Sequence, residues 1–382
     1  MSVSSAHKTE AAPTRLLTAV PICDGHDSAI NTINLELIRH GLEVIYLGYH
    51  RGAKEIVRAA IQEDVRAIGL STYNGGHIEF FSEIATMLRE AGADDIKIFG
   101  GGGGTITHAD TEQMYKEGTD RIYFAGTPLQ QMMDEIDQRY GGPRPTTIPN
   151  HASEEWCFSR TLSAAEDGSG PAEWTGRKIG ASGRSIVIGI TGPGGVGKTT
   201  LIDELVLRFL KLQPKGRVAV LSHDPSILGK GALLGDRATM IYSQHERVFM
   251  RSLGTRGQAG GLAPTTERCL RFLCSAGFDL ILVETVGIGQ EAAPFGRELV
   301  DKTMFVMGPD YGSRLQLQKI VMLDVADIVV VNKSDYSGAK TATAEVEQRI
   351  AFNKQGQRLV TTCAKRHRDK GVDELFKLLT TP

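Results

Sequence analysis

A glycine-rich turn between an apolar run and an amphipathic run constrains this chain of 382 residues more than any other feature. The turn is part of GITGPGGVGKTT, in which Gly192–Thr199 satisfies the pattern GxxxxGK[ST]. The apolar run SIVIGI precedes it, and the helix-like run TTLIDELVLRFLKL follows. Glycines there let backbone N–H groups surround a phosphate, and the helix N-terminus adds positive potential. The pattern therefore predicts a strand, a phosphate-binding loop and a helix in succession.

Two further motifs predict how a nucleotide binds. Lys198 is expected at the β- and γ-phosphates, and the Thr199 hydroxyl at Mg²⁺. Asn332-Lys333-Ser334-Asp335 follows the apolar run DIVVV and resembles a guanine-specificity motif, while TTCAK (Thr361–Lys365) stands where GTPases have an SAK-like loop. We expect GTP or GDP to bind. Asp335 alone is equally compatible with a helix N-cap. The predicted nucleotide-binding residues are Gly192, Gly194, Gly195, Val196, Gly197, Lys198, Thr199, Thr200, Asn332, Lys333, Asp335 and Ala364.

Two acidic residues at predicted strand ends are candidates for holding Mg²⁺. Asp224 ends VAVLSHD, and Glu284 ends LILVE at the start of ETVG, which resembles the DxxG motif with Glu for Asp. Either carboxylate holds the metal directly or through water, or is a solvated strand end. The predicted catalytic set is Lys198, Thr199, Asp224 and Glu284, and Gln290 is a weak candidate for positioning the attacking water.

The segments along the chain predict an α/β fold with two doubly wound parallel-sheet domains. Residues 15–140 alternate five strand-like runs with amphipathic stretches, and residues 185–382 form a second alternating series. Residues 141–184 are rich in Pro, Gly, Ser and Thr, which predicts a linker with a short helix near Glu154–Leu162. Residues 1–14 are expected to be a disordered tail.

Composition argues against several partners. The net charge of −2 gives no support for a nucleic acid or a membrane surface. Absence of a run of about 18 apolar residues argues against a membrane span. The five cysteines form no CxxC pair, which favours a reducing cytoplasm over a disulfide framework.

Four motifs of the second half carry a family resemblance over residues 185–380. GPGGVGKTT, SHDPSILGKGALLGDRATM, DLILVETVGIGQE and ADIVVVNKSD together resemble the G-protein metallochaperones of cobalamin-dependent acyl-CoA mutases. Phe249–Gly261 and Leu317–Asp327 look closest to the variant in fused isobutyryl-CoA mutases. The resemblance implies that the loops around Asp224, Arg251–Gly261 and Asp310–Gln318 are switch regions that contact a cobalamin domain.

The first half resembles the flavodoxin-like cobalamin-binding domain of the same mutases. The family pattern is DxHxxG, 41 residues, SxL, about 26 residues and GG. Here Asp24–Ala29 is followed by residues 30–70, Ser71–Tyr73, residues 74–99 and Gly100–Gly101. Ala29 and Tyr73 depart from the family's Gly and Leu.

The resemblance implies that His26 is a cobalt ligand whose other ring nitrogen binds Asp24. The displaced base of the cofactor then enters a slot near Ser71 and Gly100–Gly104. His77 either contacts the corrin or caps a helix. The predicted cobalamin-binding residues are Asp24, Gly25, His26, Asp27, Ser71, Tyr73, Gly75, Gly76, His77, Gly100, Gly101 and Gly102.

These domains leave no residues for the substrate barrel of such a mutase, so this chain alone is not expected to isomerise an acyl-CoA. We expect a GTP-hydrolysing metallochaperone fused to a cobalamin-binding domain, gating the loading, protection or editing of adenosylcobalamin. Its expected partner is a catalytic barrel subunit or domain, and a homodimer stays open. Two alternatives remain: the small subunit of an active mutase with a built-in GTPase, and a corrinoid methyl carrier.

Overall fold

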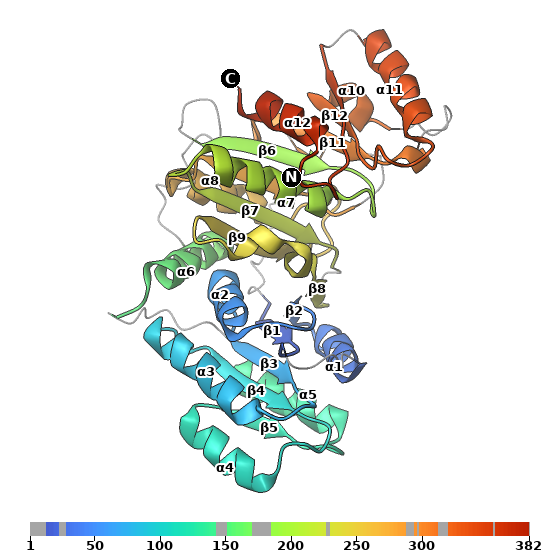
Figure 1. Cartoon of the computed structure of the whole chain (residues 1–382). Coiled ribbons are helices and arrows are strands. Elements are labelled where there is room, and N and C mark those ends of the chain that lie inside the picture. Colours follow the sequence, from blue (N-terminus) through green and yellow to red (C-terminus); the bar gives the residue numbers. More distant parts are fainter. Residues whose placement is uncertain are drawn as a thin grey trace, which may run out of the picture.

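The computed structural model contains two parallel-sheet α/β units, one above the other in Figure 1, which confirms the predicted fold class. The description covers residues 13–22, 28–142, 151–169, 185–226, 230–287, 294–295, 298–311, 320–353 and 356–381. Each strand pair in the two sheets is parallel, as expected where strands alternate with helical crossovers.

The first sheet has six strands in the order β5-β4-β3-β1-β2-β8. Its strands are β1 (Arg15–Ala19), β2 (Glu43–Tyr46), β3 (Ala67–Ser71), β4 (Lys97–Gly101), β5 (Arg121–Tyr123) and β8 (Ala232–Leu234). The helices of this part of the chain are α1 (Ser28–Arg39), α2 (Ala53–Glu63), α3 (His77–Glu90), α4 (His108–Glu117) and α5 (Leu129–Tyr140).

Both faces of the first sheet are covered, which explains why its strands are nearly continuous apolar runs. On one face, Leu37 of α1 and Ile136 of α5 belong to one buried apolar cluster. On the other face, Ile56 of α2 and Ile84 of α3 belong to a second cluster. The carboxyl ends of the strands therefore meet at one edge, where α/β sheets bind ligands.

The second sheet has seven strands in the order β13-β12-β11-β6-β10-β7-β9. They are β6 (Ile186–Thr191), β7 (Val218–Asp224), β9 (Val248–Gly254), β10 (Leu280–Glu284), β11 (Lys302–Met307), β12 (Ile328–Val331) and β13 (Arg358–Thr361). Its helices are α7 (Lys198–Leu212), α8 (Thr266–Ser275), α10 (Met322–Val325), α11 (Ala339–Asn353) and α12 (Lys370–Thr380), with 3-10 turns η2 (Asp236–Thr239), η3 (Ile241–Gln244) and η4 (Pro309–Tyr311).

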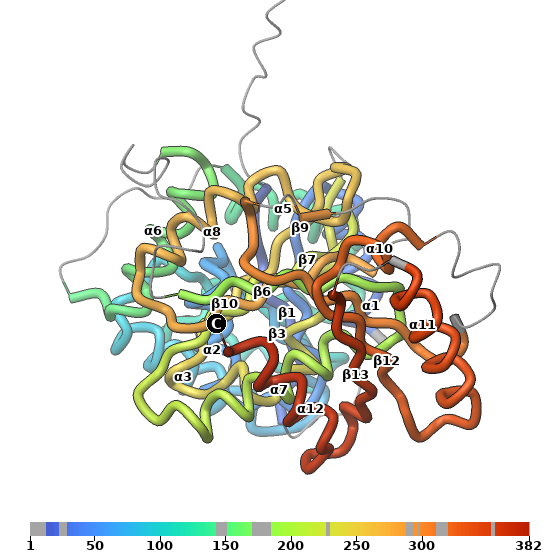
Figure 2. Tube along the Cα trace, turned by 90° about the horizontal axis from the view of Figure 1, so that it is seen from above, coloured from blue at the N-terminus to red at the C-terminus, as the bar shows by residue number. Residues whose placement is uncertain are grey.

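Helices α7 and α12 cover one face of the second sheet, since Leu205 and Leu375 belong to the same buried cluster. Helix α8 packs on the other face, where Leu270 joins Ile281 of β10. Seen from above, α10 and α11 lie on the opposite side of this unit from α6 and α8 (Figure 2).

Helix α6 (Glu154–Asp167) runs five residues beyond the short helix predicted within the linker. Ser153 caps its first turn by accepting a hydrogen bond from the Trp156 N–H, and Gly168 ends it with φ 75°. Trp156 belongs to the core of the first unit, whereas Leu162 belongs to the core of the second. The helix therefore packs against both units.

Strand β8 is the feature that the sequence does not predict. Its chain position lies between β7 and β9 of the second unit, yet it pairs with β2 of the first, Leu233 opposite Val44. The Gly231 N–H donates to Ile38 O at 2.9 Å, and the Ala232 N–H donates to Leu42 O at 3.2 Å. Figure 1 shows β8 beside β2, at the junction of the two units.

Strand β9 also differs from expectation, because the family resemblance implies a loop around Arg251–Gly261, whereas the strand extends to Gly254. Val248–Gly254 is a fully buried edge strand paired with β7, and it includes Arg251. The arginine is buried because its guanidinium donates to Gln62 O, Ser163 Oγ and Ser159 O. Among the described residues, no helix is both long enough and apolar enough to cross a membrane.

Candidate functional site

The glycine-rich loop lies between β6 and α7, at the carboxyl edge of the second sheet. Gly192 has φ 150°, and a Cβ there would lie 1.9 Å from Val306 O, so only glycine fits. Gly195 and Gly197 have φ 73° and 87°, in the left-handed region that favours glycine. A Cβ on Gly287, the last residue of ETVG, would lie 2.6 Å from Gly194 Cα. Two glycines therefore let the loop after β10 touch the phosphate-binding loop.

Lys198 and Thr199 begin α7 and face the carboxylates of neighbouring strands. Lys198 is buried, and its Nζ lies 3.2 Å from Pro193 O and 4.0 Å from Glu284 Oε1. Burial lowers the pKa of the Lys198 ammonium. The Thr199 Oγ1 donates to Glu284 Oε1 at 3.0 Å. Thr200 follows on the exposed side of the helix.

Asp236, which the sequence analysis missed, joins Asp224 and Glu284 at this site. Its Oδ1 lies 3.5 Å from Thr199 Oγ1, and Ser222 donates a hydrogen bond to its Oδ2. The Gly235 N–H donates to Asp224 Oδ2 at 3.2 Å. Burial, and then the nearby Asp236 carboxylate, raise the pKa of both Asp224 and Glu284 to about 8. Asp236 lies within the family motif SHDPSILGKGALLGDRATM, but nothing in that motif singles it out as a site residue; strand β8 brings it here.

These residues fit an Mg²⁺ ion bound together with a nucleotide. Glu284 Oε2 is buried without a hydrogen-bond partner, and the surrounding donors are hard oxygens. Among the described residues, no group of three or more His, Cys, Asp and Glu side chains is placed to hold a metal ion. At nucleotide sites Mg²⁺ takes one or two carboxylates plus substrate phosphates. Bound there, the ion would neutralise phosphate charge.

The residues predicted to bind guanine meet at the carboxyl ends of β12 and β13. Asn332 Nδ2 donates to Val196 O at 2.9 Å, which ties the motif to the phosphate-binding loop. Its Oδ1 accepts from Thr362 Oγ1 at 3.0 Å and from the Ala364 N–H at 3.1 Å. Lys333 has φ 59°, a conformation that turns the chain sharply after β12. One side chain therefore holds three segments of the predicted site together.

Asp335 has both carboxylate oxygens engaged by the TTCAK loop. Cys363 Sγ donates to its Oδ1 at 3.2 Å, and Lys365 forms an ion pair with its Oδ2. The hydrogen bonds from Lys365 and then Cys363 lower the pKa of Asp335. An ionised carboxylate is what two guanine N–H donors require.

A cavity of about 170 Å³ lies beside the first sheet, on the face covered by α1 and α5. Ser71, Gly100, Gly101 and Gly102 line it, together with Gly103. Neighbouring atoms occupy the space that a side chain at these glycines would need. A Cβ on Gly101 would lie 2.7 Å from Tyr123 O, and one on Gly102 would lie 2.2 Å from Thr72 O. The glycine run therefore lets the backbone pack closely beside the cavity.

The remaining predicted residues of this unit surround the start of α3. A Cβ on Gly103 would lie 2.2 Å from Tyr73 Cε2, so the Tyr73 ring packs on the glycine run. Gly75 is exposed, and Gly76 precedes α3 with φ 85°. His77 Nε2 lies 3.4 Å from Asp110 Oδ2, and the imidazole is only 10% exposed. Asp24, Gly25, His26 and Asp27, and also Gln290, lie outside the described residues.

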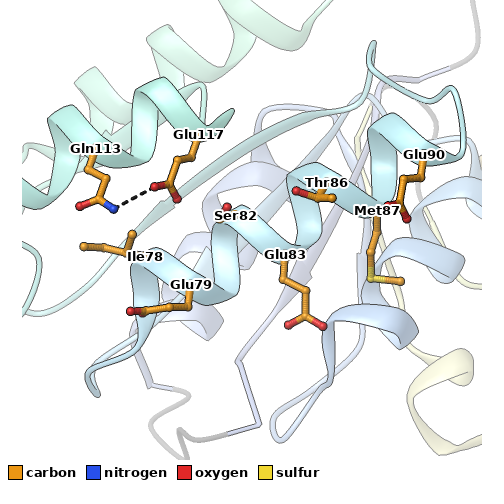
Figure 3. Close-up of a pocket in the computed structure, with 9 residues that line it drawn as sticks. All are labelled: Ile78, Glu79, Ser82, Glu83, Thr86, Met87, Glu90, Gln113 and Glu117. Carbon is orange, nitrogen blue, oxygen red and sulfur yellow. Dashed lines mark hydrogen bonds between the residues drawn. The ribbon is translucent and has the colours of Figure 1, made fainter.

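A larger, open groove of about 500 Å³ lies between α3 and α4 (Figure 3). Glutamates line it, including Glu79, Glu83 and Glu117. It runs along the flank of the unit and holds none of the predicted site residues. The predicted site residues that the structure describes lie instead near the carboxyl edges of the two sheets.

Comparisons with known proteins agree with this arrangement. Residues 172–381 match the family model for the methylmalonyl Co-A mutase-associated GTPase MeaB, and residues 14–130 match the B12 binding domain. Fused isobutyryl-CoA mutases of Geobacillus kaustophilus and Nocardia farcinica are 36% and 38% identical over 96% and 99% of this chain. The chain spans only about a third of their length, 36% and 37%.

A solved structure, that of the LAO/AO transport system kinase, is 22% identical to this chain. The matched region covers 65% of this chain and 70% of the kinase chain, with a TM-score of 0.39. The glycine-rich loop, the guanine-reading motif and the family match together make the second unit a P-loop GTPase. The chain belongs to the family of methylmalonyl Co-A mutase-associated GTPases of the MeaB type and carries a B12-binding domain ahead of its GTPase domain.

Proposed function

We propose that this protein uses GTP to gate the loading, protection or editing of adenosylcobalamin for an acyl-CoA mutase. One observation carries the proposal: Ala232–Leu234, which lies between Asp224 and Asp236 in the chain of the GTPase unit, is a strand of the B12-binding sheet. A change at the nucleotide site therefore has a covalent route to the sheet that is proposed to hold the cofactor.

The route is short. Asp224 holds the Gly235 N–H, and Leu234 just before it pairs with Ile45 of β2. Asp236 is next, 3.5 Å from the Thr199 hydroxyl at the phosphate-binding loop. Phosphate and Mg²⁺ add charge beside these carboxylates, and charge changes of this kind bias switch segments.

A buried ion network anchors the same junction from the other side. Glu43 of β2 accepts from Arg15 Nε at 2.9 Å and from Arg256 Nε at 3.1 Å. Glu166 of α6 accepts from Arg15 at 3.1 Å and from Arg256 at 2.7 Å. Arg256 follows β9 of the GTPase unit, in the predicted switch region Arg251–Gly261. The network fixes the arrangement of the two units at this junction, because breaking a buried ion pair is costly.

In this proposal Thr199 and Glu284 hold Mg²⁺ together with the nucleotide phosphates, Asp224 and Asp236 act on the ion through bound water, and the cavity beside Ser71 and Gly101 takes the tail base of the cofactor. His26 is the proposed cobalt ligand, and cobalt-bound adenosyl is the form delivered. The matched relatives are fused isobutyryl-CoA mutases, so the proposed partner is an acyl-CoA mutase barrel, in a separate subunit or in the rest of a longer chain. The proposed compartment is the cytoplasm.

The test is the rate at which the loaded chain passes adenosylcobalamin to a purified cofactor-free barrel subunit. We expect different rates with GTP, with GDP and with a non-hydrolysable GTP analogue. Ala232→Pro removes the N–H that bonds to Leu42 O and should make the rates alike. Leu233→Ser is the matched control, because Leu233 is 43% exposed on the same strand.

Equal transfer rates in all nucleotide states of the wild-type chain would contradict the gating proposal. Acyl-CoA isomerisation by the mixture at full rate without nucleotide would favour the small subunit of an active mutase. Methyl transfer from a methylated cofactor to a methyltransferase would favour the carrier alternative.

A further inference from the structure

His223 is a buried polar side chain near the end of β7, directly before Asp224. The residue is only 2% exposed. Its Nδ1 lies 2.7 Å from Glu284 O, and its Nε2 lies 2.8 Å from Thr266 Oγ1 in the first turn of α8. The imidazole therefore joins three segments of the GTPase unit: β7, the end of β10 and the start of α8.

The imidazole lies where β7 and β10 separate. The ladder between these two strands ends at the pair of Leu221 and Val283. From there β7 continues along β9 as far as Asp224, and β10 continues along β6 as far as Glu284. A strand that leaves its neighbour needs other donors for the carbonyls on that side. His223 supplies such a donor to the carbonyl of Glu284.

The direction of each hydrogen bond follows from the chemistry of its acceptor. A backbone carbonyl only accepts, so Nδ1 of His223 carries the ring proton. Burial lowers the pKa of His223 to about 4, so at neutral pH Nε2 is an acceptor and the Thr266 hydroxyl donates to it. Ala263 O also lies 2.7 Å from that hydroxyl, but it accepts from the Thr266 N–H at 3.1 Å as well. The hydroxyl is therefore available to hold the ring.

His223 and the Glu284 carboxylate lie on opposite faces of the sheet. Side chains alternate along a strand, so His223 shares the α8 face with Leu221, and Glu284 shares the α7 face with Leu282. On that face Glu284 Oε1 accepts from Thr199 Oγ1 at 3.0 Å. The imidazole thus holds the peptide of Glu284 from behind, while the carboxylate points into the nucleotide site.

We infer that His223 is a positioning residue for GTP hydrolysis, which holds the Glu284 peptide so that the carboxylate faces Thr199 and the ion bound there. The inference rests on the proposed binding of Mg²⁺ by Glu284 and Thr199, and it adds the side chain that orients the carboxylate. Thr266 acts with His223, because its hydroxyl fixes the ring. Residues that orient metal ligands in this way change metal affinity without touching the ion.

The test measures how tightly Mn²⁺, a probe for Mg²⁺, binds to the GDP complex of the full chain, using the EPR signal of the free ion. His223→Leu fills the space without a donor and should weaken Mn²⁺ binding about tenfold. Thr266→Val loses the hydroxyl at nearly the same volume and should weaken Mn²⁺ binding about threefold. Thr266→Ser keeps the hydroxyl and should bind Mn²⁺ as the wild type does.

GTP hydrolysis gives a second readout. His223→Leu and Thr266→Val should need more Mg²⁺ for the half-maximal rate, yet stay within about twofold of the wild-type rate when Mg²⁺ is saturating. Cys269→Ala is the matched control, because Cys269 is buried about one turn further along α8, in the same apolar cluster as Leu221. It should leave the Mn²⁺ affinity and the Mg²⁺ requirement at their wild-type values.

Unchanged Mn²⁺ affinity in both His223→Leu and Thr266→Val would overturn the inference. So would an equal loss in Thr266→Ser or Cys269→Ala, which would mean a general destabilisation of α8. Glu284→Gln tests the proposed metal site separately and should itself weaken Mn²⁺ binding. If Glu284→Gln binds Mn²⁺ as tightly as the wild type, the metal assignment of Glu284 fails, and the inference fails with it.

Discussion

Arg237 and Glu63 form an ion pair between the GTPase unit and the B12-binding unit, with Nε 3.0 Å from Oε1 and both side chains completely buried. Glu63 also accepts from the Ser252 N–H, and Arg237 donates to Gln62 Oε1 at 2.7 Å. Arg237 directly follows Asp236 of the nucleotide site. The junction between the units and the phosphate site thus use adjacent residues.

Arg237→Ala should strongly destabilise the protein, because it removes the nearer cation of the buried Glu63 carboxylate and leaves only Arg251, whose Nε lies 4.0 Å away. Loss of one partner from a buried pair costs about 3–5 kcal/mol of unfolding free energy. Urea denaturation followed by circular dichroism measures the change. Arg271→Ala, which removes an exposed helical pair with Glu267, is the control and should cost less than about 0.5 kcal/mol. Equal costs would contradict the burial argument.

Lys198→Ala should lower GTP hydrolysis about 100-fold or more, because a buried cation at the phosphates stabilises charge in the transition state. Phosphate release gives the rate, and visible absorbance checks that cobalamin still binds. Lys211→Ala, at the exposed end of the same helix, should hydrolyse GTP at the wild-type rate. Hydrolysis retained in Lys198→Ala would mean that the loop does not act on phosphate.

Asp236→Asn should raise the Mg²⁺ concentration for half-maximal hydrolysis about tenfold, since the variant loses a carboxylate beside Thr199. The measurement is a Mg²⁺ titration of the hydrolysis rate at saturating GTP. Asp134→Asn, an exposed change on α5, serves as the control. An unchanged Mg²⁺ requirement would restrict the metal site to the two carboxylates predicted at strand ends.

Asp335→Asn should weaken GTP binding by about 10- to 100-fold, because guanine loses a charged acceptor for two N–H donors. Xanthosine triphosphate, which presents an acceptor there, should bind the variant better than it binds the wild type. Competition against a fluorescent guanine nucleotide measures both affinities. An unaltered preference would contradict the assignment of Asp335 to guanine.

His26→Ala should remove the protein nitrogen from cobalt. The EPR spectrum of bound cob(II)alamin reports that nitrogen as a superhyperfine splitting, which is expected in the wild type and not in the variant. His40→Ala, a histidine at the exposed end of α1, should keep the splitting. Identical EPR spectra for the wild type and His26→Ala would contradict the assignment of His26 as the cobalt ligand.

The sequence predicts those parts of the site whose residues form short, contiguous motifs. The loop from Gly192 to Thr199 and the motif Asn332–Asp335 each lie at one strand end, so local spacing suffices to place them. The strands of both sheets are equally local, since burial on two faces makes them apolar runs.

The position of Asp236 at the nucleotide site and the pairing of β8 could not be predicted from local motifs. Ala232–Leu234 is three residues long, and its partner strand begins at Glu43, far away in the chain. Its pairing depends on the docking of two units, which no local pattern encodes. Arg251 illustrates the same limit: a charged residue inside a strand argues against burial until its distant acceptors are known.

The position of β8 also bears on how the chain is divided for experiments. A fragment ending before residue 185 would lack β8, so the β2 edge of its sheet would have unpaired backbone groups. Such an exposed edge promotes edge-to-edge aggregation. The GTPase fragment would in turn carry a loose apolar strand and the uncompensated charges of Arg237 and Arg251. We therefore expect the two units to be poor stand-alone fragments, and co-expression of the halves to recover material that neither yields alone.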